Sequence, residues 1–379
     1  MIILAWTPFF SSDLAESMYE VGLSDCEFRC IATNDRRSLS KARAVLFHIR
    51  DMKSTDLPLS RSQENLFTFY LYESPPHTGD ILHYIPSDYF NLTMTYRSLS
   101  KARAVLFHIR DMKSTDLPLS RSQENLFTFY LYESPPHTGD ILHYIPSDYF
   151  NLTMTYRSDS DVQAVYGLMR PINNFTSSEE MWRWEEIERI AENKTKSALL
   201  FVSNCVTESK RELYARELAR YIEVSEFGQC SKRECNAQCA EREIAQHHFY
   251  LAFENSVCRD YVTEKAFMRM EKIIVPVVLK RSIASSLLPN GSFIAADDFD
   301  SPASLAAYMQ HLETNKTEYL KYFEWTKVYK RKTKLNYACS LCTFLHMDSK
   351  NPRVIHDIKS WWFGNGGCIK DYAKHLLTH

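Results

Sequence analysis

The stretch "FYLAFENSVCRDYVTEKAF" at residues 249–267 joins a short apolar run to a helical pattern through a polar loop. Its first part, 249–253, is apolar and aromatic, as in a buried parallel strand. Glu254 and Asn255 end that run, and the spacing predicts a helix over Tyr261–Glu271. A strand that passes into a helix is half of a βαβ unit, so this stretch predicts an α/β fold.

The rest of the chain repeats this alternation. Strands are predicted at Ile2–Trp6, Ala44–Ile49, Phe67–Tyr72, Ala104–Ile109, Phe127–Tyr132, Ala198–Val202, Phe249–Phe253 and Ile273–Leu279. Further helices are predicted at Glu179–Ala191, Lys210–Ile222, Pro302–Thr314 and Lys316–Lys330. A break around Pro171–Ser178 separates the halves, so we expect two Rossmann-like domains facing a cleft, at residues 1–170 and 171–379.

The first half contains an exact tandem duplication. Residues 37–98 are identical to residues 97–158, at an offset of 60. Repeat architectures need at least about three units, so two identical units do not form a solenoid. One N-terminal sheet cannot pair every strand of both copies, and unpaired strands promote aggregation. We therefore expect one copy to be a surface insertion.

Composition excludes several classes of protein. Hydrophobic residues make up 45% of the chain and charged residues 24%, which is typical of a globular protein. The net charge is −2, so no basic field indicates a nucleic-acid partner. No apolar run approaches the roughly 18 residues that a transmembrane helix needs.

Polar residues follow three of the predicted strands. They are Glu133-Ser134 after 127–132, Ser203-Asn204 after 198–202, and Glu254-Asn255 after 249–253. Ligands of open α/β sheets bind just beyond the carboxyl ends of the strands. Three such ends in one chain predict a shared cleft.

Two cations stand where helices begin after these loops. Arg211 opens the helix after Ser203-Asn204, and Lys265 lies in the first turn after Thr263. Helix N-termini attract phosphate, although a capped helix with a solvated Glu264–Lys265 pair explains the second position equally simply. The nine glycines form neither GxGxxG nor a P-loop. Side chains would therefore have to hold a diphosphate.

Two patterns raise the question of metal binding. Asp159-Ser160-Asp161 has the Asp-x-Asp form that suits Mn²⁺ or Mg²⁺, but the string is short and follows no clear strand end. Zinc has suitable ligands in Cys230, Cys235 and Cys239 with His247 or His248, but their spacing matches no strong zinc pattern. Disulfides or buried thiols explain the cysteines better, and we expect no metal site.

The chain also carries signs of an oxidising compartment. It has ten cysteines, several in close pairs. Six N-x-[ST] sequons occur, at Asn91, Asn151, Asn174, Asn193, Asn290 and Asn315, and the last four are the glycosylation candidates. These features favour the secretory pathway, with any signal or membrane anchor absent from this chain.

At this point the residues resemble a known family. The stretch 249–267 resembles the signature of the α-1,3-fucosyltransferases of glycosyltransferase family 10. Other blocks follow in the family's order: "ARAVLFHIRD", "YESPPHT", "FNLTMTYRSDSDVQAVYG", "LLFVSNC", "KRELYARELARYI", "VPVVL", "SFIAADDF", "YFEW", "CSLC" and "WW". The resemblance covers the whole chain except one repeat unit.

The resemblance implies a GT-B fold and inverting transfer of fucose from GDP-fucose to a GlcNAc hydroxyl of a glycoprotein or oligosaccharide glycan, in α-1,3 linkage. The general base would be the glutamate of "YESP", which is Glu133 or, in the other copy, Glu73. The copy that continues into the donor half favours Glu133. The residue roles implied in the donor half are diphosphate binding by Arg211 and Lys265, fucose contact by Glu264, lining of the donor site by Asn255 and Tyr261, and proximity to the nucleotide for Ser203 and Asn204.

Other implied properties concern cofactors and location. The C-terminal cysteine motif suggests a disulfide between Cys339 and Cys342. No bound cofactor is implied, and no divalent metal for donor binding, with Mn²⁺ at most stimulating transfer. The family's location is the Golgi lumen, at the cisterna membrane through a type II anchor that this chain lacks.

Two alternatives stay open. The family's second arginine in YRRDSD is Ser158 here, at the duplication junction. A catalytically inactive or misfolded glycan-binding paralogue is therefore the main alternative, and a GT-B enzyme with another sugar nucleotide is a second.

Overall fold

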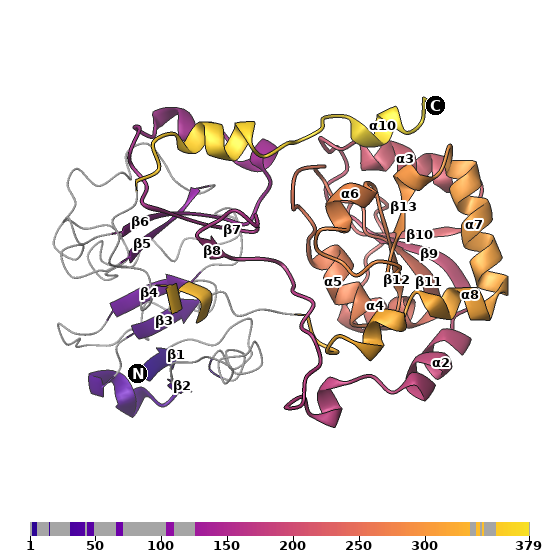
Figure 1. Cartoon of the computed structure of the whole chain (residues 1–379), viewed down its shortest axis with the longest axis horizontal. Helices are drawn as coiled ribbons and strands as arrows, with labels where there is room; N and C mark the ends of the chain where they lie inside the picture. Colours follow the sequence, from indigo (N-terminus) through magenta and orange to yellow (C-terminus); the bar gives the residue numbers. More distant parts are fainter. Residues whose placement is uncertain are drawn as a thin grey trace.

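The computed structural model describes residues 2–5, 15, 31–41, 44–48, 66–70, 104–109, 126–333, 339–341, 343–344 and 354–378. In this part of the chain, two strand-rich regions lie on the N-terminal side and one helix-covered sheet on the C-terminal side (Figure 1). The described residues include Glu133, whereas Glu73, Asn91 and Cys342 lie outside them.

The C-terminal half is built on a five-stranded parallel sheet with the order β10-β9-β11-β12-β13. Its strands are β9 (Lys196–Phe201), β10 (Val224–Phe227), β11 (His247–Leu251), β12 (Val275–Val278) and β13 (Ile294–Ala295). The chain starts in the interior at β9, moves to one edge with β10, and then crosses back to β11. A ligand of a doubly wound sheet binds at this reversal, beyond the carboxyl ends of β9 and β11.

Helices cover both faces of this sheet (Figure 1). They are α2 (Trp184–Glu192), α3 (Arg211–Leu218), α4 (Ala237–Gln246), α5 (Glu264–Met270), α6 (Arg281–Ala284), α7 (Pro302–Thr314), α8 (Lys316–Lys321) and α10 (Tyr372–His375). Because side chains alternate along a strand, Leu200 and Leu251 pack on one face and Leu199 and Tyr250 on the other. The sheet therefore has two apolar cores, which fix the positions of its strand ends.

Among its described residues, the N-terminal half has two four-stranded parallel sheets instead of the one expected. The first has the order β2-β1-β3-β4 and the second β5-β6-β7-β8. Their strands are β1 (Ile2–Ala5), β2 (Ile31–Thr33), β3 (Ala44–His48), β4 (Leu66–Tyr70), β5 (Ala104–His108), β6 (Leu126–Leu131), β7 (Leu152–Thr155) and β8 (Val162–Gln163).

The expectation of a surface insertion is wrong for the described strands of both copies. Each copy forms the same parallel pair in the same register, Ala44↔Leu66 in the first and Ala104↔Leu126 in the second. The pairs differ only in their neighbours, because β3 pairs with β1 while β6 pairs with β7. Identical sequence thus forms identical local structure in two different sheets.

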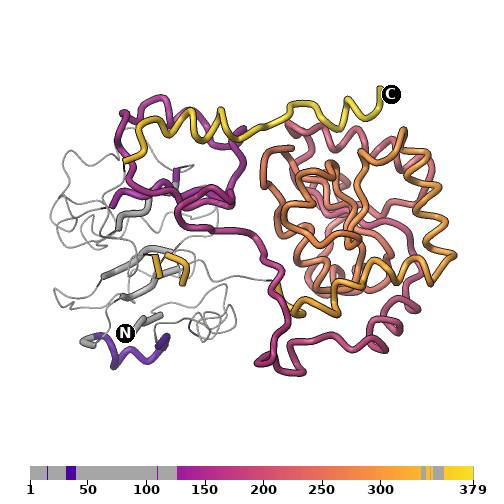
Figure 2. Tube along the Cα trace, viewed as in Figure 1, coloured from indigo at the N-terminus to yellow at the C-terminus, as the bar shows by residue number. Residues whose placement is uncertain are grey.

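The C-terminal segment returns to the N-terminal half. Trp362 is fully buried there, with its ring 5.2 Å from that of Phe129, and its Nε1 donates to Thr138 Oγ1 over 2.7 Å. The chain then crosses back to α10 (Figure 2). Residues 354–364 therefore pack on the second N-terminal sheet, although the sequence-based division assigns them to 171–379.

Cys230, Cys235 and Cys239, the candidate zinc ligands, all form disulfides. Cys205 pairs with Cys230, Cys235 with Cys239, and Cys258 with Cys368. Because disulfide sulfurs are not thiolates, this removes the ligands of the zinc hypothesis. Cys339 is also disulfide-bonded, and its pairing with Cys342 stays a prediction because Cys342 lies outside the described residues.

Two further findings concern the helices. Across the described residues, no helix is both long and apolar enough to cross a membrane. The predicted helix at Tyr261–Glu271 begins only at Glu264, because Thr263 is its extended N-cap and accepts from Lys265 N.

Trp362 provides a test of the returning segment. We expect Trp362→Ala to lower the free energy of unfolding by about 3–5 kcal/mol, because it removes a fully buried indole and leaves a cavity. Urea denaturation measures this change. Phe175→Ala is the control, since Phe175 is 95% exposed and its loss should change stability by no more than about 0.5 kcal/mol. Equal effects of the two variants would contradict the packing described.

Candidate functional site

The site lies where the ends of β9 and β11 meet the loop after β6. Ser203 and Asn204 follow β9 and are exposed, whereas Glu254 follows β11 and is only 8% exposed. The two strands are neighbours in the sheet, so these polar ends share one edge. The sequence-based expectation of a shared edge for them agrees with this arrangement.

Glu254 organises the loop between β11 and α5. Its Oε1 accepts from both the N–H and the hydroxyl of Thr263, each over 2.8 Å. Its Oε2 lies 3.1 Å from Lys265 Nζ. Burial works against the charge of Lys265, but the Glu254 and Glu264 carboxylates outweigh it and raise the lysine's pKa. Lys265 is therefore a cation held in place at this strand end.

Arg211 bridges the two strand ends. Its guanidinium donates to Phe253 O over 2.6 Å and to Asn204 O over 3.3 Å. Burial lowers its pKa, and the nearby Glu254 carboxylate opposes that shift. The Nε–H is buried and donates to none of the described residues. The charge of Arg211 also acts on Lys265, so the two predicted diphosphate ligands lie close enough to interact.

Tyr261 and Asn255 complete this side of the site. Tyr261 is 3% exposed, and its ring centroid lies 5.0 Å from that of Tyr156. Burial raises the pKa of Tyr261, and the next strongest influence is the Glu133 carboxylate, which places Glu133 near this ring. The backbone oxygen of Asn255 accepts from Ser209 N over 2.9 Å, which fixes the loop before Tyr261.

Glu133 follows β6 in a short, well-defined corner. It is half-buried, and the next residues form a 3₁₀ turn at Pro135–His137. His137 N donates to Ser134 O over 2.9 Å, and Ser134 Oγ lies 2.8 Å from Ser256 Oγ in the other half. The loop that carries Glu133 is therefore attached directly to the donor-side loop.

Glu264 differs from its neighbours because it is exposed. Its Oε1 lies 3.4 Å from Lys265 Nζ, at the outer side of the lysine. The structure thus brings together Glu133, Arg211, Tyr261 and Lys265, with Glu264 at the rim. Glu73, the alternative candidate for the general base, lies outside the described residues.

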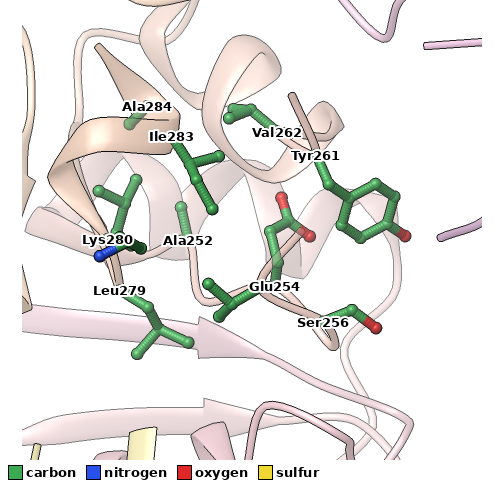
Figure 3. Close-up of a pocket in the computed structure, with 11 residues that line it drawn as sticks. Ala252, Glu254, Ser256, Tyr261, Val262, Leu279, Lys280, Ile283 and Ala284 are labelled. Carbon is green, nitrogen blue, oxygen red and sulfur yellow. The ribbon is translucent and has the colours of Figure 1, made fainter. Parts of the chain in front are cut away.

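A small cavity lies behind this site (Figure 3). Its volume is about 20 Å³, and its lining includes Glu254, Ser256, Tyr261 and Lys280. That volume suits about one water molecule. A larger hollow of about 340 Å³ is lined by Asp297, Asp298 and Asp300, of which Asp297 is paired with Lys280 and Asp298 with Arg281.

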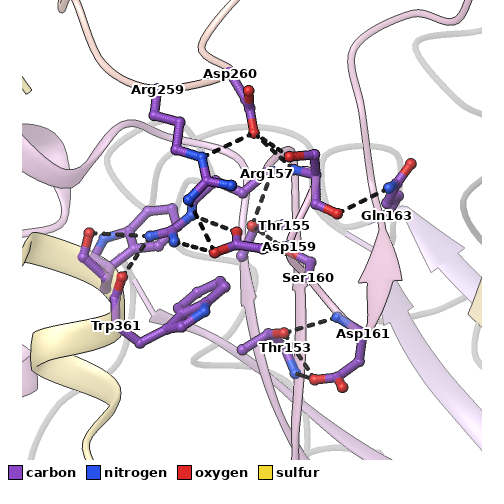
Figure 4. A network of polar contacts seen from close by, with 12 residues as sticks. Thr153, Thr155, Arg157, Asp159, Ser160, Asp161, Gln163, Arg259, Asp260 and Trp361 are labelled. Atoms are coloured by element: carbon purple, nitrogen blue, oxygen red, sulfur yellow. Dashed lines mark hydrogen bonds and ion pairs between the residues drawn. The ribbon is translucent and has the colours of Figure 1, made fainter. Parts of the chain in front are cut away.

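Both carboxylates of the Asp-x-Asp string make protein contacts (Figure 4). Asp159 accepts from Arg157 Nη2 over 2.6 Å and lies 3.4 Å from Arg259 Nη1. Asp161 accepts from the N–H and the hydroxyl of Thr153, each over 2.8 Å. These contacts give the string a structural role and leave the metal hypothesis without support.

The structure also separates the sequons. Asn151 is buried and its Oδ1 accepts from Phe127 N over 2.8 Å, so an oligosaccharide cannot be attached there. Asn174, Asn193 and Asn290 are exposed, and Asn315 Oδ1 caps α8 by accepting from Glu318 N. Glycosylation at these four positions stays a prediction.

Sequence reasoning missed Ser256 and Asp260, and it named Ser134 only as a residue at a strand end. Ser134, Ser256 and Asp260 make contacts between the halves, over sequence separations of more than one hundred residues. Of these three residues, only Asp260 has an unusual local conformation, a left-handed backbone with φ of 59°. No pattern of spacing could have revealed these partners.

Models of known families match both halves of the chain. The model for the family described as glycosyltransferase family 10 (fucosyltransferase) C-term matches residues 191–361. The model described as fucosyltransferase, N-terminal matches twice, at residues 1–101 and 98–167. The two N-terminal matches reflect the repeated unit.

Curated relatives give the same family. Alpha-(1,3)-fucosyltransferase C of Drosophila melanogaster is 37% identical over 69% of this chain and 65% of its own length. Glycoprotein 3-alpha-L-fucosyltransferase A of the same organism is 34% identical over 75% of this chain and 56% of its own. The human 4-galactosyl-N-acetylglucosaminide 3-alpha-L-fucosyltransferase FUT6 is 34% identical over 66% of this chain and 69% of its own. The chain spans less than two thirds of the length of the two fly proteins.

A solved structure is also similar. A crystal structure of an alpha1,3-fucosyltransferase with GDP-fucose is 14% identical, with a TM-score of 0.46, over 78% of this chain and 84% of that one. The parallel sheets, together with the family models, confirm the predicted α/β, GT-B class. The chain belongs to glycosyltransferase family 10, the fucosyltransferases.

Proposed function

We propose that this protein transfers fucose from GDP-fucose to a GlcNAc hydroxyl of a glycoprotein glycan, in α-1,3 linkage and with inversion. Two observations support this proposal: the charges of Arg211 and Lys265 lie at the ends of β9 and β11, and Glu133, after β6, adds to the effect of burial in raising the pKa of Tyr261. The names of the relatives, which specify glycoprotein and N-acetylglucosaminide acceptors, support the acceptor class. We further propose that residues 1–170 form the acceptor side and 171–379 the donor side.

The donor would be held by side chains. Arg211 is anchored through two of its nitrogens, so its positive charge is fixed at the ends of β9 and β11. Lys265 supplies a second charge in a buried setting, where an ion pair is stronger than in water. Ser203 and Asn204 would lie near the nucleotide, Asn255 and Tyr261 would line the donor site, and Glu264 would contact the fucose.

The reaction would be a single displacement. Glu133 takes the proton of the acceptor hydroxyl while the hydroxyl oxygen bonds to the anomeric carbon of fucose. The bond from that carbon to the diphosphate breaks in the same step. The electron pair leaves with GDP, whose growing negative charge Arg211 and Lys265 stabilise. One carboxylate opposite the leaving group is sufficient for inversion.

Three disulfides within the described residues support a location in an oxidising lumen, which we propose to be that of the Golgi. The alternative of an inactive paralogue is not favoured, because the described strands of both copies pair within sheets and the site residues still converge.

Removing the proposed base tests the mechanism. Glu133→Gln should lower kcat for fucose transfer by about 100-fold or more, because an amide cannot accept the acceptor's proton. Affinity for GDP-fucose, measured by calorimetry, should stay near that of the wild type.

The duplicated chain offers a matched control. Glu73→Gln makes the same change in the other copy and should leave transfer intact. Loss of activity in Glu73→Gln, with Glu133→Gln active, would show that the wrong copy was assigned.

Replacing Lys265, one of the two proposed diphosphate ligands, tests donor binding. Lys265→Ala should weaken GDP binding by about 10-fold or more, because a buried charge partner is lost. The raised pKa of Lys265 keeps it protonated, so its contribution should not decline between pH 7 and pH 9. Lys316→Ala removes an exposed, Glu192-paired lysine and should change nothing. Unchanged GDP affinity in Lys265→Ala would refute the proposed role of Lys265 in binding the diphosphate.

Chelation tests the role given to metal. Because two side-chain cations would neutralise the diphosphate, GDP affinity should be the same in EDTA as in Mn²⁺. Calorimetric titration under both conditions measures this. A large loss of affinity in EDTA would show that donor binding needs a divalent cation.

A further inference from the structure

Two sets of hydrogen bonds cross between the halves beside residues with proposed roles. Ser134 Oγ and Ser256 Oγ lie 2.8 Å apart, and both residues are almost fully buried. Ser134 directly follows Glu133, and Ser256 directly follows Asn255. The contact therefore joins the loop of the proposed base to the loop of the donor site.

The backbone around Ser134 shows what this hydroxyl does. Ser134 is the N-cap of the turn at Pro135–His137, a position where serine usually bonds its own turn. Here its side chain makes no capping hydrogen bond. The hydroxyl bonds to Ser256 instead. Thr138 Oγ1 donates to Ser134 O and accepts from Trp362 Nε1, so Trp362 supports the same turn.

A second contact lies on the other side of Tyr261. Ser158 donates to Asp260 Oδ2 from its N–H over 2.9 Å and from its hydroxyl over 2.6 Å. Asp260 has a left-handed backbone, which a non-glycine residue adopts at a cost. Between the two contacts, the Tyr156 ring of one half packs on the Tyr261 ring of the other. The two sets of hydrogen bonds and the ring contact thus all join the two halves.

We propose that Ser134 and Ser256 are a positioning pair, whose hydrogen bond sets the Glu133 carboxylate at the correct distance from the bound donor. The inference rests on the proposed function. Neither hydroxyl needs to touch substrate, because each acts through the residue before it. A shift of about 1 Å in a catalytic group can cost about 100-fold in rate, so a single buried hydrogen bond at this point has a large effect on kcat.

A double-mutant cycle tests the pair. Ser134→Ala and Ser256→Ala should each lower kcat for transfer by about 10- to 100-fold, and the double variant should lose no more than either single variant. GDP affinity should stay within about twofold of the wild type, because Arg211 and Lys265 are untouched; this binding also shows that each variant is folded. The control is Ser304→Ala, which removes the contact of Ser304 Oγ with Ser301 Oγ, 3.2 Å away, at the start of α7. It should leave kcat unchanged.

The outcomes separate the two proposals. Additive losses in the double variant, or a lower melting temperature with unchanged kcat, would overturn the positioning role while leaving the proposed function intact. If the wild type transferred no fucose from GDP-fucose in the same assay, the proposed function would fall and the positioning role with it.

Discussion

The buried carboxylate of Glu254 is the interaction on which the donor half depends. A carboxylate taken out of water is unfavourable unless it is paired and hydrogen-bonded. Glu254 meets this condition with the N–H and hydroxyl of Thr263 and the ammonium group of Lys265. These contacts end the strand, set the first residue of α5, and hold Lys265 next to Arg211. The same group thus serves the fold and presents the cations.

The proposed mechanism needs a fixed relation between the two halves, because the base would lie on one half and the sugar on the other. Trp362 attaches the C-terminal segment to the second N-terminal sheet, and hydrogen bonds from Ser134 and Ser158 reach the donor-side loop. Arg157 adds to this junction, since it is fully buried, binds Asp159 and lies 4.0 Å from the Trp361 ring centroid. The duplication leaves this junction in place because β6 and β7 both belong to the sheet that carries it.

Much of the fold could be predicted from local pattern. Apolar runs identified β9 and β11, and the polar residues after them identified the sheet edge where Arg211 and Lys265 lie. The start of α5 was predicted three residues too early, because Thr263 is held extended by Glu254. The strand at Val224–Phe227 and the helix at Ala237–Gln246 were missed, since their short amphipathic patterns lie in a polar, cysteine-containing region.

The second N-terminal sheet and the Ser134–Ser256 contact could not be predicted. A strand's sequence specifies its two faces but not which neighbour pairs with its edge, so β3 and β5 look identical until their partners are known. Contacts between residues more than one hundred positions apart leave no trace in spacing. The sequence indicated the kinds of residues at the site, and the packing of the two halves decided which of them meet.

The most direct test of the central claim is a crystal structure of this protein with GDP-fucose and an acceptor sugar. The account predicts the diphosphate on Arg211 and Lys265, with the acceptor hydroxyl about 2.6–3.2 Å from a Glu133 oxygen. A diphosphate bound away from both cations, or an acceptor hydroxyl out of reach of Glu133, would contradict it.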